Sequence, residues 1–146
     1  MVVYVYDDQQ GMTVLEAMLK QLFGESLLFH GYASAGDLML AAEHHYFDIV
    51  FANLEFNGTD GMRLLGALQR HYPKSNFIGV ANTESLHDAL LLHRIHASGY
   101  LIKPYKAEQL SDLFMHLRFP VADSGAMHTT NLAYSQLNLR GKNYGK

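Results

Sequence analysis

The residues of this sequence that suit chemistry stand where short apolar runs end. Two adjacent carboxylates, Asp7 and Asp8, follow the run at 2–6, and a lysine, Lys103, ends the run at 99–103. An acid pair supplies the hard oxygen ligands that Mg²⁺ prefers, and a lysine neutralises negative charge such as that of a phosphoryl group. Each residue alone has an ordinary explanation, since Asp favours turns and a lysine at a strand end is commonly solvated.

Five apolar runs alternate with five amphipathic stretches, and this alternation predicts the elements that position those side chains. The runs are rich in β-branched and aromatic residues, as strands buried on both faces are. The first helix is expected to begin at Thr13, with Glu16 at capping-box spacing, and to stop at Gly24. Ser34 and Asp37 repeat the capping-box spacing before the second helix. The five expected strands occupy residues 2–6, 27–32, 48–53, 77–81 and 99–103.

Strands and helices that alternate in this way predict an α/β fold with an open, five-stranded parallel sheet that is doubly wound, with helices on both faces. Sheets of this class carry their functional residues in loops at the carboxyl ends of the strands, near the topological switch point. That rule selects five candidate site residues at or just after strand ends. They are Asp7, Asp8, Asn53, Ala81 and Lys103.

Composition limits the class of protein. Hydrophobic residues make up 49% and charged residues 17%, as in a globular domain, and a formal net charge of −3 indicates neither a nucleic-acid-binding nor a membrane surface. The absence of cysteine is compatible with a reducing cytoplasm, and the apolar runs are too short to span a bilayer. We therefore expect a cytoplasmic protein with one domain at 1–119. Residues 120–146, rich in Ser, Thr, Asn and Gly, are expected to form a linker or C-terminal tail.

Four segments together make residues 1–119 resemble the CheY-like receiver domains of two-component response regulators. The resemblance implies the flavodoxin-like strand order 2-1-3-4-5, and a role in phosphorelay signal transduction instead of enzymatic catalysis. The segments are the acid pair Asp7–Asp8 and the runs DIVFANLEFNGTDG at 48–61, FIGVANT at 77–83 and GYLIKPY at 99–105.

The resemblance assigns roles to the candidate residues. In receiver domains an acid pair and an aspartate after the third strand hold Mg²⁺, and that aspartate accepts a phosphoryl group from a histidine kinase. Asp7 and Asp8 match the acid pair. Lys103 matches the lysine that contacts the phosphoryl group, and Tyr100 matches the aromatic switch position.

Two positions depart from the family pattern. Asn53 stands where the phosphoacceptor aspartate is expected, and Ala81 where receivers have a Ser or Thr hydroxyl. A neutral amide oxygen is a poor nucleophile on which no acyl phosphate forms, so Asn53 is not expected to be phosphorylated. Mg²⁺ is left with Asp7 and Asp8 as its anionic ligands, and its binding is expected to be weakened or lost. The sequence therefore predicts an atypical receiver, or pseudo-receiver.

Two hypotheses describe how such a domain rests in one conformation without phosphate. In the first, Glu55, two residues past Asn53, supplies a local negative charge. In the second, Asn53 accepts a hydrogen bond from Lys103, which mimics a neutralised pocket.

The expected partners are proteins: an output domain, a kinase or a second receiver. Receivers commonly dimerise or dock an output domain through the surface of the fourth helix, fifth strand and fifth helix, so a homodimer through residues around Tyr100 is one expectation. An ordinary solvated face is an equally open interpretation. The residues of this surface include His87, Arg94, Tyr100, Lys106 and Asp112.

Three functions follow from these expectations. The run HASGYLIKPY resembles receivers fused to DNA-binding output domains of transcription factors, which implies transcription regulation through an output domain. The alternative is a stand-alone adaptor that binds a kinase or another receiver. An enzyme that binds a nucleotide or flavin on the same scaffold is disfavoured, because Asp7 and Asp8 would repel phosphate and the sequence contains no G-x-G-x-x-G motif.

Overall fold

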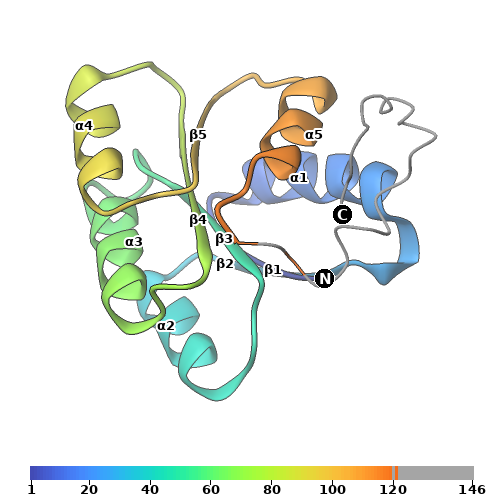
Figure 1. Cartoon of the computed structure of the whole chain (residues 1–146), viewed down its shortest axis with the longest axis horizontal. Helices are drawn as coiled ribbons and strands as arrows, with labels where there is room; N and C mark the ends of the chain where they lie inside the picture. The colour runs from blue at the N-terminus through green and yellow to red at the C-terminus, as the bar shows by residue number, and fades with distance from the viewer. Residues whose placement is uncertain (120, 122–146) are drawn as a thin grey trace.

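A computed structural model of the chain describes residues 1–119 and residue 121. Five parallel strands form one sheet in the order β2-β1-β3-β4-β5 (Figure 1). This confirms the predicted fold class and strand order. The strands are β1 (Val2–Tyr6), β2 (Leu28–Tyr32), β3 (Ile49–Asn53), β4 (Asn76–Ala81) and β5 (Gly99–Ile102).

Five helices cover the two faces of the sheet. In Figure 1, α1 and α5 lie on one side of the strands, and α2, α3 and α4 lie on the other. A short 3₁₀ turn at Gly24–Ser26 follows α1. The helices are α1 (Gln9–Phe23), α2 (Ala35–His44), α3 (Asp60–His71), α4 (Leu86–Arg94) and α5 (Ala107–Met115).

The central strand β1 shows why its sequence is apolar throughout. Successive side chains of a strand point to opposite faces of the sheet. Val3 and Val5 therefore join the core beneath α1 and α5, whereas Tyr4 and Tyr6 join the core beneath α2, α3 and α4. All four side chains are at most 2% exposed. Both faces of β1 are thus inside the protein, which leaves its carboxyl end as the place for polar groups.

The first helix begins four residues earlier than its sequence predicted. Helix α1 starts at Gln9, and its N-cap is Asp8, whose side chain accepts a hydrogen bond from the N–H of Gly11. The prediction of a start at Thr13 was wrong because an Asp at the N-cap satisfies the first turn directly. The Thr13 hydroxyl instead donates to the Gln9 carbonyl, one turn earlier. The second predicted cap is confirmed: Ser34 accepts from the N–H of Asp37 at the start of α2.

Helix α3 packs closely against the end of β3, and Gly61 allows it. A Cβ atom at this position would lie 2.1 Å from the Asn53 carbonyl oxygen and 2.9 Å from its carbonyl carbon. Because these are backbone atoms, the clash cannot be relieved by a side-chain rotation, and the helix must move away from the strand.

Gly61→Ala is therefore expected to lower the free energy of unfolding by about 1–3 kcal/mol, despite the better helix propensity of alanine. Urea denaturation measures this. Gly66→Ala is the matched control in the same helix, because its Cβ atom would meet Arg70 Nη1 at an ordinary 3.7 Å. The control is expected to be neutral or stabilising by up to about 1 kcal/mol. Equal effects of the two substitutions would contradict this account of the packing.

The described chain ends at the edge of the sheet opposite to the strand ends that carry the candidate site. Asn76, the first residue of β4, donates from Nδ2 to the carbonyl of Phe119 at 2.8 Å and accepts from the Phe119 N–H at 3.1 Å. Val121 is 4% exposed and belongs to the core beneath α1 and α5. Apart from Val121, the predicted linker or tail at 120–146 lies outside the described residues.

Candidate functional site

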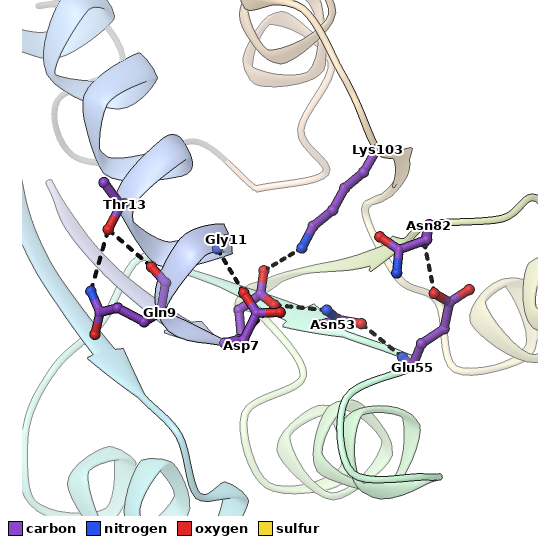
Figure 2. Close-up of polar contacts among 9 residues, drawn as sticks. Asp7, Gln9, Gly11, Thr13, Asn53, Glu55, Asn82 and Lys103 are labelled. Atoms are coloured by element: carbon purple, nitrogen blue, oxygen red, sulfur yellow. Dashed lines mark hydrogen bonds and ion pairs between the residues drawn. The ribbon is translucent and has the colours of Figure 1, made fainter.

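Three of the predicted site residues meet where β1, β3 and β5 end. Asp7 directly follows β1, Asn53 is the last residue of β3, and Lys103 directly follows β5. The strand order reverses beside β1, since β2 lies on one side of it and β3 on the other, so this is the topological switch point of the sheet. Figure 2 shows the three side chains converging at this edge.

Asp7 is the centre of the site and is 4% exposed. Its Oδ2 forms an ion pair with Lys103 Nζ at 3.0 Å. Its Oδ1 accepts hydrogen bonds from Asn53 Nδ2 and from the Asp8 N–H, both at 2.7 Å. Hydrogen bonds to a charged acceptor are short and strong, so three donors offset much of the cost of burying this carboxylate. Partners within the chain thus engage both oxygens of Asp7.

The orientation of the Asn53 amide follows from its two neighbours. The backbone N–H of Glu55 can only donate, and it points at Asn53 Oδ1 at 2.8 Å. The Asn53 NH₂ group must therefore face the Asp7 carboxylate, which can only accept when it is ionised. Asn53 is 4% exposed, so this arrangement is shielded from water. Where the receiver family is expected to carry a nucleophilic carboxylate, this chain presents the NH₂ group of Asn53 with its two N–H donors.

The hypothesis that Asn53 accepts a hydrogen bond from Lys103 was wrong. Lys103 Nζ donates to Asp7, and the oxygen of Asn53 is directed to the Glu55 N–H instead. The physical reason is that an ammonium group binds a carboxylate more strongly than a neutral amide oxygen. Lys103 does neutralise a charge in the pocket, as the hypothesis supposed, but that charge is the carboxylate of Asp7.

The acid pair does not act as a pair in this arrangement. Whereas Asp7 points into the site, the Asp8 side chain is exposed and accepts the N–H of Gly11 at 2.8 Å at the start of α1. A carboxylate at this place also interacts favourably with the positive end of the helix dipole. Gly11 is needed for a second reason, because a Cβ atom there would lie 2.1 Å from Asp7 Oδ2.

Ala81 ends β4 beside the site and is fully buried. Its carbonyl accepts the N–H of Lys103 at 2.7 Å, which fixes the backbone from which the lysine side chain extends. The methyl side chain of Ala81 offers neither a donor nor an acceptor to the pocket. The position therefore contributes to the site through its backbone alone.

The pattern at the strand ends agrees with a comparison to protein families. The family model of the response regulator receiver domain matches residues 2–114. The chain belongs to the response regulator receiver domain family. Members of this family are signalling domains of two-component systems, and the predicted family is thereby confirmed.

Three matching relatives of this receiver domain are distant from it in sequence. Over 142 residues it is 25% identical to "Two-component response regulator-like APRR9" of Arabidopsis thaliana, covering 94% of this chain and 30% of that protein. A receiver domain of Methanospirillum hungatei matches with a TM-score of 0.65 and 21% identity, over 76% of this chain and 87% of that one. The beryllofluoride-activated NtrC4 receiver domain dimer matches with a TM-score of 0.67 and 18% identity, over 77% and 91%.

Receiver domains typically bind Mg²⁺ at this site, but the donor set of this receiver fits the ion poorly. Mg²⁺ requires oxygen ligands in a near-octahedral arrangement. Asp7 is paired with Lys103, Asp8 caps α1, and Asn53 turns its NH₂ group toward Asp7. Among the described residues, no group of three His, Asp or Glu side chains is placed to hold a metal ion. Binding of Mg²⁺ would require Asp7 to exchange its bond to Lys103 for the ion.

Tyr100, the predicted switch residue, lies in β5 on the side of α4. Its ring is half-buried against the core beneath α2, α3 and α4, and its hydroxyl oxygen accepts the N–H of Ser85 at 3.2 Å. Burial raises the pKa of Tyr100, the hydrogen bond from Ser85 lowers it, and the nearby carboxylates raise it further. The ring thus connects β5 to the start of α4, 15 residues away in the sequence.

Tyr105 gives the site a measurable response to high pH. It is 7% exposed, and burial, followed by the negative charge of Asp7, raises its pKa to about 12. Below pH 10 the phenol is neutral in both the folded and unfolded chain. Between pH 10 and 12 it ionises first in the unfolded chain, so the folded state loses up to about 2–3 kcal/mol as the pH rises through this window.

Tyr105→Phe is expected to reduce this loss of stability between pH 10 and 12. Denaturant unfolding at pH 8, 10 and 11.5 measures it. Tyr46→Phe serves for comparison, because the pKa of Tyr46 is also raised to about 12, chiefly by its hydrogen bond to Asp48, far from the site. If Tyr105→Phe leaves the slope of stability against pH unchanged, the assigned burial of this phenol is incorrect.

The roles of Glu55 and Gly11 in the site went beyond what the sequence predicted. Glu55 was expected to supply negative charge, but its carboxylate accepts two backbone N–H groups of the loop that follows β4. Gly11 had no expected role, because it stands before the helix start that the sequence predicted at Thr13.

Proposed function

We propose that this receiver domain signals through contacts with protein partners without accepting a phosphoryl group on residue 53. It acts in two-component signalling as a binding module and not as an enzyme. The observation that carries the proposal is the Asn53 amide, held between the Glu55 N–H and Asp7 with its NH₂ group toward the pocket. An amide in this position offers no anionic oxygen to attack phosphorus.

Two further features support the proposal. Lys103, which would neutralise a transferred phosphoryl group, is already paired with Asp7, and Ala81 has no hydroxyl to bind a phosphoryl oxygen. The start of α1 is not available as a phosphate site for a nucleotide or flavin either, because Asp8 caps it. These observations favour a signalling module over the enzyme alternative.

The partner surface that we propose is formed by α4, β5 and α5. Leu86 and Leu90, one helical turn apart on α4, are 75% and 57% exposed and together place two large apolar side chains on one face of that helix. The charged and polar residues predicted for this surface, His87, Arg94, Lys106 and Asp112, are all exposed. An apolar strip with a polar rim is the usual composition of a protein interface.

Several partners fit such a surface, and a second copy of the receiver is the first to test. The matched NtrC4 receiver is a dimer. Sedimentation velocity over a range of concentrations is expected to show a species of twice the monomer mass. A monomer at every concentration would favour an output domain or a kinase as the partner.

No helix in the described part of the chain is long and apolar enough to cross a membrane.

The proposal extends to the whole protein. The receiver spans 30% of the length of its curated relative, and we propose that residues 120–146 link it to an output domain that regulates transcription in the cytoplasm. A stand-alone adaptor is the alternative if no output domain follows. The sequence encoded beyond Lys146 decides between these two functions.

Incubation with acetyl phosphate and Mg²⁺, followed by intact mass spectrometry, tests the absence of phosphorylation. We expect no increase by the mass of one phosphoryl group. A cognate histidine kinase, as phosphoryl donor, provides the second arm. A hydroxylamine-sensitive phosphoryl group on this chain in either arm would overturn the proposed function. Such sensitivity identifies an acyl phosphate, which a carboxylate of the chain would then have accepted.

A further inference from the structure

One side chain from the loop after β3 and one from β5 hold the loop that joins β4 to α4. The Glu55 carboxylate accepts the Asn82 N–H through Oε1 at 2.9 Å and the Thr83 N–H through Oε2 at 3.2 Å. Figure 2 shows Glu55 reaching across to Asn82 from the end of β3. At the other end of the loop, the Tyr100 hydroxyl accepts the Ser85 N–H at 3.2 Å. The β4–α4 loop is therefore anchored at both ends.

The backbone that carries Glu55 is itself fixed by the site. The Glu55 N–H donates to Asn53 Oδ1 at 2.8 Å, and the preceding Leu54 N–H donates to the Val80 carbonyl at 2.8 Å. Asn53 in turn binds Asp7. A continuous chain of polar contacts thus runs from the buried site to the β4–α4 loop.

Two consecutive backbone N–H groups that converge on one acceptor form a binding place for an anion. Carboxylate and phosphoryl oxygens are equivalent in this respect, because both are anionic and accept strong hydrogen bonds from N–H groups. Glu55 lies two residues past Asn53, so its carboxylate reaches the loop from the same strand end that would carry a phosphoryl group.

We propose that the Glu55 carboxylate is a built-in anion that holds the β4–α4 loop, and Tyr100 with it, in the arrangement that a phosphoryl group on residue 53 would otherwise have to maintain. The inference rests on the proposed function, in which residue 53 carries no phosphoryl group. In this proposal, Glu55 is a residue that positions the partner surface through the β4–α4 loop.

The loop transmits this position to the partner surface through its last residue. Ser85 is the N-cap of α4, and its side chain accepts the Asp88 N–H at 3.2 Å. Its own N–H is the group bound by Tyr100. A shift of the loop therefore moves the start of α4, where Leu86 is exposed, together with the Tyr100 ring of β5.

Glu55→Gln tests the proposal in the full chain, because glutamine keeps the length of the side chain and removes its charge. Amide hydrogen exchange and NMR chemical shifts are recorded without any phosphoryl donor. We expect about tenfold faster exchange of the Asn82 and Thr83 amides, and also a change at the Ser85 amide and in the Tyr100 ring resonances. Because Glu55 is exposed, the variant is expected to fold.

Glu84→Gln is the matched control, since it removes one negative charge from an exposed side chain of the β4–α4 loop itself. It is expected to leave the exchange rates of the Asn82 and Thr83 amides unchanged. If Glu55→Gln affects Asn82 and Thr83 but not Ser85 or Tyr100, the carboxylate is only a local cap and the proposal is wrong. Equal effects of the two variants would also overturn it.

Failure of this inference is distinguishable from failure of the proposed function. The exchange experiment contains no phosphoryl donor, so it reports on the Glu55 anchor alone. The acetyl phosphate experiment on the wild-type chain reports only on whether the chain accepts a phosphoryl group. Unchanged exchange with no phosphorylation rejects the anchor and keeps the function, whereas phosphorylation of the wild type rejects the function.

Discussion

Asn53→Asp is expected to destabilise the metal-free domain by about 1–3 kcal/mol and to make its stability depend on Mg²⁺. The substitution replaces the 2.7 Å hydrogen bond between Asn53 Nδ2 and Asp7 Oδ1 by a contact between two carboxylates. Both positions are 4% exposed, so water does little to screen the repulsion. Lys103 is a single cation and neutralises only one of the two charges.

A third carboxylate also changes what the pocket can bind. An aspartate at residue 53 adds a buried carboxylate beside Asp7, and Asp8 supplies a third anionic oxygen ligand for Mg²⁺ when it exchanges the Gly11 N–H for the ion. An ion that binds the folded state alone stabilises it by mass action. We therefore expect millimolar Mg²⁺ to raise the melting temperature of the variant and to leave that of the wild type nearly unchanged.

Thermal unfolding with and without Mg²⁺, at constant ionic strength, measures both effects. Gln21→Glu is the matched control, because it makes the same change from an amide to a carboxylate at an exposed position of α1. The control is expected to change stability by no more than about 0.5 kcal/mol and to show no Mg²⁺ dependence. If the melting temperature of Asn53→Asp does not change with Mg²⁺, the amide of Asn53 is not what weakens Mg²⁺ binding.

The second large effect is expected for Lys103→Met, which removes the cation from a largely buried ion pair. The Asp7 side chain is 6% exposed and that of Lys103 is 21% exposed, at a distance of 3.0 Å. The substitution leaves the Asp7 carboxylate with amide partners only, at an expected cost of about 2–4 kcal/mol in the free energy of unfolding. Methionine fills much of the space of the lysine stem, so the loss reports mainly on the charge.

A double-mutant cycle separates the pair from its surroundings. Adding Asp7→Asn to Lys103→Met removes the unpaired carboxylate and is expected to restore part of the lost stability. Lys20→Met serves as control, because the Lys20–Glu16 pair on α1 is 61% and 39% exposed and is expected to contribute less than about 0.5 kcal/mol. Equal losses for Lys103→Met and Lys20→Met would contradict the assigned burial of the site pair.

The fold was predictable because its three central strands, β1, β3 and β4, are buried on both faces. A run such as 77–81 has no polar residue to interrupt it, and the observed β4 (Asn76–Ala81) extends it by one residue. The start of α1 was less predictable, since both Asp8 and Thr13 are acceptable N-caps. Which of them caps the helix depends on where β1 ends, and that is decided by the sheet.

The identities of the site residues followed from the strand ends, but their partners did not. Lys103 and Asp7 are 96 residues apart, and the sequence alone did not distinguish the Asp7 carboxylate from the Asn53 amide as the acceptor for the lysine. The contact between Glu55 and the backbone of Asn82 was hidden for another reason. A backbone N–H is present at almost every residue, so no side-chain pattern marks the amides that an anion will find.

The closure of the pocket by Lys103 and Asn53 has a consequence for regulation in the cell. When a ligand binds only the folded or active form of a protein, the population of that form follows the ligand concentration. A pocket whose charges are already satisfied within the chain removes that dependence. Under the proposed function, the signal of this domain is set by how many copies are made and degraded. Gene expression and turnover then control it, in place of metal supply or phosphate donors.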